Sequence, residues 1–164
     1  MDVGISPGLR GAITGFPPAT VVNGTIYAPD DSPAVEAMLT QAKSDLTDAY
    51  LSAMNAVSPV PAIVAGDIGG STLTPGIYKS HSTLMVQSGN LILNAQGNSN
   101  AFWVFQVADG FTTIGGAGGD IILANGAKAE NVFWQIGSSA TIGDYTSFKG
   151  NILALTSIDR KSVV

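Results

Sequence analysis

The sequence predicts a mainly β protein, a parallel β-solenoid of triangular section with one long α-helix packed alongside it. Two observations indicate this fold class. One stretch of the chain has the period of a helix, and the second half repeats three short strand-like segments three times with no helical pattern between them. A single coil of such a fold cannot bury its own inner side chains, so stacked coils share a continuous core.

The helix is predicted over about residues 32–57. From Val35 onward the apolar residues recur at spacings of three and four, which places them on one face. Ser32 is suited to cap the first turn, and Pro33 suits the first helical position because proline has no amide to satisfy. Ser58 and the prolines beyond it end the pattern. A helix of about 25 residues would be roughly 37 Å long and needs a long apolar partner.

The strand-like segments recur at a period of about 24–30 residues, in the ranges 77–100, 101–130 and 131–158. Gly, Asn, Asp and Ser separate the segments, as expected for strands that end in tight turns. A β-sandwich is the alternative fold, but it predicts hairpin turns rather than three corners per period. The first segments are 77–79, 102–107 and 132–136, the second are 84–86, 111–114 and 140–142, and the third are 91–94, 121–125 and 151–154.

Composition argues against two classes of partner. Seven basic residues stand against twelve acidic ones, the formal net charge is −5, and no basic stripe is present to bind phosphate. Anionic membrane surfaces are disfavoured for the same reason, and no stretch approaches the ~20 apolar residues of a membrane span. No signal-peptide pattern is visible at the start. We therefore expect no nucleic-acid partner and no membrane partner.

Catalytic chemistry finds little support. His81 is the only histidine and the chain has no cysteine, which excludes a cysteine nucleophile and a conventional zinc site. Asp67, Asp109, Asp120 and Asp144 lie at predicted corners, where aspartate ordinarily bonds its own backbone. We expect no enzyme activity, no catalytic residue, no metal and no cofactor.

Two other motifs favour structural interpretations. The glycine-rich run at 115–119 lacks the Lys-Ser or Lys-Thr and the helix of a phosphate-binding loop. Trp103 and Trp134 alternate with branched residues in strand-like segments, so we expect them in the core rather than on a sugar-stacking face. A cell-surface adhesin or a carbohydrate-contacting structural solenoid is the alternative function.

Short uncharged side chains recur in the second segments and in the corners after them. Stacked strands lie about 4.8 Å apart and outward residues along one strand about 6.6 Å apart, so these side chains would form a grid. Such distances are close to the repeats of an ice lattice and predict an ice-binding face, although threonine is also simply a good strand residue. The predicted ice-binding residues are Thr83, Ser88, Asn90, Thr112, Thr113, Ser139, Thr141, Thr146 and Ser147.

Several motifs follow one another in the order typical of one protein family, over nearly the whole chain. They lie at 6–8, 13–18, 66–78 (GDIGGSTLTPGIY), 94–97, 131–141 (NVFWQIGSSAT) and 150–154. In these motifs the chain resembles the microbial ice-binding proteins, whose fold is a discontinuous right-handed β-helix with a long helix alongside. The resemblance implies a secreted or cell-surface protein, which we expect to be a monomer. It would adsorb to an ice crystal surface through a flat Thr/Ser/Ala/Gly-rich face, giving thermal hysteresis or recrystallisation inhibition.

The chain also departs from the family pattern. The triplet 88–90, Ser-Gly-Asn, stands where Thr-Gly-Thr is common, so we expect moderate or poor activity. We predict one ice-binding domain over 1–158. The family usually has further strands before residue 2 and after residue 158, and their loss would leave an unpaired edge that favours aggregation. Residues 159–164 match the translation of a common sequencing-library adapter and are predicted to be a non-native tail.

Overall fold

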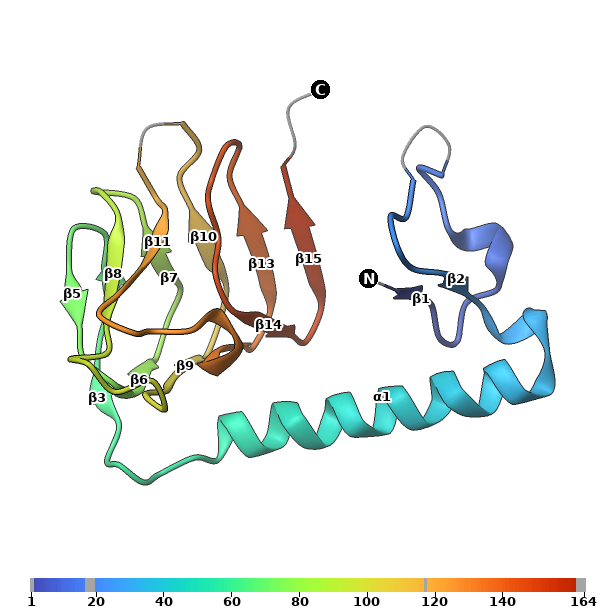
Figure 1. Ribbon diagram of the computed structural model, residues 1–164, viewed down its shortest axis with the longest axis horizontal. Coiled ribbons are helices and arrows are strands. Elements are labelled where there is room, and N and C mark those ends of the chain that lie inside the picture. Colours follow the sequence, from blue (N-terminus) through green and yellow to red (C-terminus); the bar gives the residue numbers. More distant parts are fainter. Residues whose placement is uncertain (1, 17–19, 117, 162–164) are drawn as a thin grey trace. The chain divides into compact units, whose positions relative to one another are not determined.

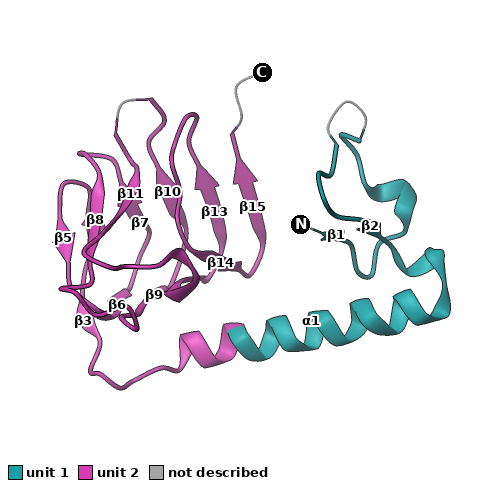
Figure 2. Ribbon diagram, in the orientation of Figure 1, with its two compact units in different colours: residues 1–49 teal, residues 50–164 magenta. Residues whose placement is uncertain are grey.

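The computed structural model describes residues 2–16, 20–116 and 118–161 (Figure 1). It confirms the predicted fold class, with three stacked parallel β-sheets, one long α-helix and a separate pair of two-residue strands. The chain divides into two compact units, Met1–Ala49 and Tyr50–Val164, which are described separately below (Figure 2). The single domain over 1–158 stays a prediction. No helix in the described part of the chain is both long and apolar enough to cross a bilayer.

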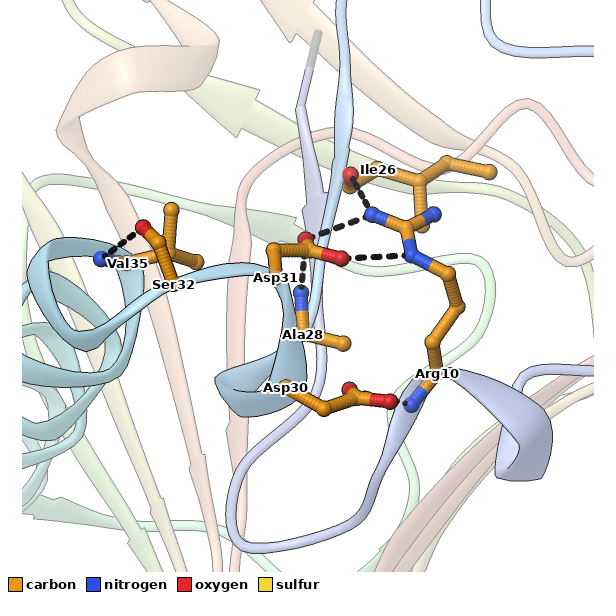
Figure 3. Close-up of polar contacts among 7 residues, drawn as sticks. All are labelled: Arg10, Ile26, Ala28, Asp30, Asp31, Ser32 and Val35. Carbon is orange, nitrogen blue, oxygen red and sulfur yellow. Dashed lines mark hydrogen bonds and ion pairs between the residues drawn. The ribbon is translucent and has the colours of Figure 1, made fainter.

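In the first unit, a short loop structure precedes the helix. Strand β1 (Val3–Gly4) pairs in parallel with β2 (Ile26–Tyr27), and 3-10 helices occupy Arg10–Ala12 and Pro29–Asp31. The Arg10 guanidinium donates to both carboxylate oxygens of Asp31 and, at 2.8 Å, to the carbonyl of Ile26 (Figure 3). The Asp31 carboxylate also accepts the amide of Ala28. This ion pair holds the pKa of Asp31 below its ordinary value and ties the loop to the start of the helix.

Helix α1 spans Pro33–Met54, so the predicted start is confirmed within one residue and the end comes three residues early. The Ser32 hydroxyl accepts the Val35 amide at 3.3 Å, as expected of a cap. The helix ends at Met54, and the side-chain amide of Gln106, from a strand, donates hydrogen bonds to backbone carbonyls at this end of the helix. It donates to the carbonyls of Ala53 and Ala56 at 2.9 and 2.7 Å.

The second unit contains three sheets of parallel strands. Sheet 1 has the order β14-β12-β9-β6-β3, sheet 2 the order β15-β13-β10-β7-β4, and sheet 3 the order β11-β8-β5. The strands of sheet 1 are β3 (Ala62–Ile63), β6 (Gly76–Ser80), β9 (Trp103–Val107), β12 (Val132–Ile136) and β14 (Asn151–Ala154). Those of sheet 2 are β4 (Gly66–Asp67), β7 (Leu84–Val86), β10 (Phe111–Thr113), β13 (Ser139–Ile142) and β15 (Ser157–Arg160). Those of sheet 3 are β5 (Thr72–Leu73), β8 (Leu91–Asn94) and β11 (Ile121–Ala124).

The predicted repeat is correct except at its last segment. Residues 151–154 form β14, which pairs with β12 in sheet 1, instead of becoming a third-sheet strand. In that coil, residues around Ser147 lie beside β11 without forming a strand: the Ser147 carbonyl accepts the Ile121 amide, and the Ser147 amide binds the Asp120 carboxylate. The last repeat therefore returns to sheet 1 after fewer residues than the predicted period of the repeat.

The core lies between the three sheets and is dominated by a column of aromatic rings. Trp103 and Trp134 are both completely buried, which confirms their predicted inward positions. Phe105 lies against Trp134 with ring centroids 3.9 Å apart and against Tyr78 at 5.5 Å. Such aromatic residues bury the most surface per side chain, about 150–250 Å² each, and dominate the stability of a core.

The outer face of sheet 1 receives the end of α1. Ala53 and Ala56 pack against Ile77, Val104 and Phe133, which point away from the aromatic core. At the other end of the chain, Asp159 and Arg160 continue β15 beside Thr141 and Ile142 of β13. Residues 162–164 of the predicted tail lie outside the described residues, and its non-native origin stays a prediction.

Candidate functional site

The outer face of sheet 2 carries a row of side chains that crosses all five strands. The register aligns Asp67, Met85, Thr112, Thr141 and Asp159 across β4, β7, β10, β13 and β15. Because each strand pairs in parallel with the next, these residues lie on the same face at the spacing of adjacent strands, about 4.8 Å. Thr112 and Thr141 are direct partners, and both are partly exposed.

A second, shorter row of hydroxyl groups runs beside the first. Ser139 and Ser157 are register partners in β13 and β15, and the Ser157 hydroxyl donates to that of Ser139 at 2.9 Å. Thr83 directly precedes β7, and its hydroxyl donates to the Asp109 carboxylate at 3.0 Å. The structure thus places Thr83, Ser139 and Thr141 on or beside this face, as the sequence predicts.

Thr113 and Thr146 do not belong to this face, which corrects the prediction for both. Only 2% of Thr113 and 4% of Thr146 is exposed. Their hydroxyls lie 3.1 Å apart; that of Thr113 accepts the Gly143 amide, and that of Thr146 donates to the Ile114 carbonyl. Because successive side chains of a strand point to opposite faces, Thr113 points inward and Thr112 points outward. Neither residue is available to a ligand at the surface.

Three other predicted residues, Ser88, Asn90 and Ser147, lie at corners instead of on the sheet. The amide of Ser88 donates to the Asp67 carboxylate, and the side-chain oxygen of Asn90 accepts the Asp120 amide. The Ser147 amide donates to the carboxylate of Asp120. These contacts join successive coils, so the three residues have structural partners and stand outside the two rows.

The ionised carboxylate of Asp67 is stabilised by hydrogen bonds within a corner. Its carboxylate binds the Ser88 hydroxyl and the amides of Gly69, Gln87 and Ser88, and these hydrogen bonds lower its pKa from 3.8 to about 2 despite partial burial. The amides reach it over 2.8 Å each. The carboxylate is therefore directed into the corner and serves to cross-link two coils.

The histidine and the acidic side chains that could serve catalysis or metal binding do not gather at one place in the described residues. His81 is exposed in the turn before β7. Within the described ranges, no three His, Asp or Glu side chains gather closely enough to hold a metal ion. A groove of about 370 Å³ lies between the end of α1 and sheet 1, beside Lys79. Its glutamines are already engaged, since Gln106 binds the helix carbonyls and Gln135 donates to the Tyr50 hydroxyl at 2.9 Å.

Two surface residues were missed by the sequence analysis. Ser157 occupies the same place as Ser139 one coil later, but only 18 residues separate them. That separation is shorter than the predicted period of the repeat, so the repeat does not predict that these two serines pair. Tyr145, in the corner after β13, is 73% exposed and has a φ of 60°. Nothing in the sequence predicts a positive φ at this tyrosine.

Comparison with known proteins shows which family the chain belongs to. The family model described as Ice-binding-like matches residues 2–163. An ice-binding protein of Nostoc sp. (strain HG1) is 44% identical over 157 residues, which cover 96% of this chain and 53% of that protein. An ice-binding protein of Flavobacterium frigoris (strain PS1) is 38% identical over 167 residues, which cover 98% and 58%. The chain thus spans little more than half the length of these two relatives.

Solved structures agree with the sequence relatives. The DUF3494 domain of Shewanella frigidimarina ice-binding protein_1 superposes with a TM-score of 0.90 at 30% identity, over 98% of this chain and 75% of that one. An ice-binding protein from an Antarctic biological consortium gives a TM-score of 0.82 at 37% identity, over 98% and 76%. The three-sheet arrangement described above is therefore shared with these proteins.

Proposed function

The chain belongs to the Ice-binding-like family, and from this premise we propose that it adsorbs to ice through the outer face of sheet 2. One observation carries the choice of face. Thr112 and Thr141 are direct outward partners in adjacent parallel strands, with the hydroxyl pair of Ser139 and Ser157 in the next row. No other outer face combines paired threonines with paired serines among the described strands.

Adsorption follows from the regular spacing of these rows. Strands about 4.8 Å apart and outward residues about 6.6 Å apart present methyl and hydroxyl groups on a grid that matches many lattice positions at once. Each group holds first-layer water weakly, so that layer can join the growing crystal. Ice then grows between adsorbed molecules as curved fronts, whose surface energy lowers the local freezing point. No bond of any solute is broken, so no catalytic group or cofactor is required.

Charge in the row through Thr112 and Thr141 is confined to its two ends, whereas beside the second row the Asp109 carboxylate accepts the Thr83 hydroxyl. Asp67 at one end directs its carboxylate into the corner, and Asp159 at the other end is paired with Lys161. Between them the row consists of Met85, Thr112 and Thr141, which carry no charge. The hydroxylated area around Thr112 and Thr141 is therefore uncharged but small, which supports moderate thermal hysteresis or recrystallisation inhibition over strong activity.

The setting of the protein follows from this function. Ice forms and grows outside cells, so we place the protein in the secreted or cell-surface class, with the ice crystal as its partner. A single flat face suffices for adsorption, and we accordingly propose that a monomer is the active form.

Paired bulky substitutions on two faces test the proposal. Thr141→Tyr places a ring in the middle of the face on sheet 2, whereas Ile122→Tyr places the same ring on the outer face of sheet 3, where Ile122 is 41% exposed. In a nanolitre osmometer we expect the unsubstituted protein and Ile122→Tyr to shape ice crystals and Thr141→Tyr to lose most of its thermal hysteresis. Circular dichroism checks that both variants fold.

Two outcomes would contradict this assignment. Unchanged crystal habit with Thr141→Tyr shows that the face on sheet 2 is the wrong one, and loss of activity with Ile122→Tyr alone transfers the site to sheet 3. If the unsubstituted protein shapes no ice at all, the function itself is wrong.

A further inference from the structure

Ile114 directly follows β10 and continues the outer face of sheet 2 by one more position. Its amide donates to the Val86 carbonyl at 3.0 Å, so the pairing of β10 with β7 extends to this residue. Successive side chains of a strand point to opposite faces, and Thr113 points inward, so Ile114 points outward as Thr112 does. Its exposed fraction of 41% agrees with this direction. Ile114 therefore lies about 6.6 Å from Thr112 along the same face.

The backbone of Ile114 is held by the coils on both sides. Its amide binds β7 of the preceding coil, and its carbonyl accepts the Thr146 hydroxyl of the following coil at 2.9 Å. Thr146 is itself buried, and its hydroxyl lies 3.1 Å from that of Thr113. Ile114 thus keeps the register of the sheet, although it stands one residue beyond the end of the strand.

The glycine-rich corner after β10 makes room for the Ile114 side chain. A Cβ on Gly119 would lie 2.9 Å from the Ile114 Cγ2 methyl carbon, and a Cβ on Gly118 would lie 4.0 Å from it. In the following coil, a Cβ on Gly143 would lie 2.7 Å from the Ile114 carbonyl carbon. A side chain at position 119 would therefore displace the isoleucine, whereas glycine leaves its methyl groups uncovered. This gives the glycine-rich run a role other than phosphate binding.

The chemistry of this position suits contact with ice. Isoleucine offers methyl groups and no hydrogen-bonding side-chain atom, so water beside it keeps its hydrogen bonds to other water molecules. Covering exposed apolar surface is favourable in proportion to its area. Continuing the register makes Gln87 and Gly143 the neighbours of Ile114 in its row, and neither carries a charge. No charged neighbour in this row therefore holds water in an arrangement that ice could not accept.

We propose that Ile114 is a further ice-contact residue, an apolar contact beside the two hydroxyl rows. The inference rests on the ice adsorption proposed above and widens the contact by a third row. Thr112 and Thr141 then lie in the middle row, with Ser139 on one side and Ile114 on the other. The middle row is flanked on both sides, and more surface meets the crystal at once.

A matched pair of isoleucines tests the proposal. Ile114 and Ile122 are both 41% exposed, but Ile122 lies on the outer face of sheet 3. In a nanolitre osmometer at equal protein concentration, we expect Ile114→Ala to lower thermal hysteresis by about two-fold or more, because apolar contact area is lost. Ile122→Ala should leave it unchanged. Ile114→Val keeps a β-branched apolar side chain and should retain most of the hysteresis.

A charge at the same two positions gives a sharper contrast. Ile114→Lys should abolish ice shaping, because its ammonium group would have to lose water at the crystal surface, whereas Ile122→Lys should shape ice normally. Both positions are exposed, so the lysine variants remain soluble and folded, and a cooperative melt of each variant checks this.

Three results would overturn the inference. If Ile114→Ala and Ile114→Lys keep full hysteresis while Thr141→Tyr loses it, the face on sheet 2 is correct and Ile114 is not part of it. Equal losses in the Ile122 variants show that any exposed isoleucine has this effect. If the unsubstituted protein shapes no ice, adsorption itself is wrong and the role of Ile114 falls with it.

Discussion

Thr112 and Thr113 are neighbours in the chain yet have opposite environments. Thr112 is part of the outer row on sheet 2, and Thr113 is buried against Thr146. The strand periodicity of two was visible in the sequence, but two threonines in succession left open which one points outward. Only the register with Phe111, which is buried beside Leu84 and Ala140, decides it.

Asp67 carries a prediction about pH. Its folded pKa of about 2 lies below the ordinary 3.8, so its contribution to stability is complete above pH 3.8 and is lost as the pH falls toward 2. We expect Asp67→Asn to lower the free energy of unfolding at pH 6 by on the order of 1 kcal/mol, since the site is partly open to solvent.

The measurement is Tm between pH 6 and pH 2 for both proteins. The gap between them should narrow below pH 3.8, because the unfolded state of the unsubstituted protein then binds a proton that the folded carboxylate, with a pKa of about 2, does not. Asp31, whose pKa is also lowered by Arg10, titrates equally in both proteins and cancels in the difference. A gap that stays constant down to pH 2 would refute the role assigned to Asp67.

Helix α1 was the element that the sequence predicted best, but the position of its C-terminal end was predicted less well than its start. The three-and-four spacing and the Ser32-Pro33 start indicated where it begins, because capping is a local property. Its end depends on Gln106, which lies about fifty residues away in sequence and points outward from sheet 1. Local sequence could not show that contact. The two-residue strands β3 and β4 were likewise missed, since they are too short to have a period.

Gln106 therefore has a testable role at the end of the helix. Gln106→Leu leaves the carbonyls of Ala53 and Ala56 without these donors, and we expect a loss of about 1–3 kcal/mol in the free energy of unfolding. Hydrogen exchange should accelerate at the amides of residues 53–56. Gln135→Leu is the matched control, because it removes only the single bond to the Tyr50 hydroxyl and should cost less. Equal effects of the two variants would argue against the helix-end role.

At the scale of the whole molecule, the repeat and the family motifs were enough to predict stacked parallel coils with a helix. They placed one segment wrongly, because residues 151–154 resemble the other third segments but join sheet 1. The second sheet was predicted as the functional face, and the structure shows how few of the predicted residues share it. Thr83, Thr112, Ser139 and Thr141 lie on or beside that face, the corner residues link coils, and two threonines are internal.

Partitioning into growing ice tests the central claim most directly. A fluorescently labelled sample is exposed to a single ice crystal grown slowly on a cold probe, and the protein in ice is compared with that in the remaining liquid. We predict enrichment in the crystal for the native protein and exclusion for the same protein after heat denaturation. Exclusion of the folded, monomeric protein from the ice would contradict adsorption.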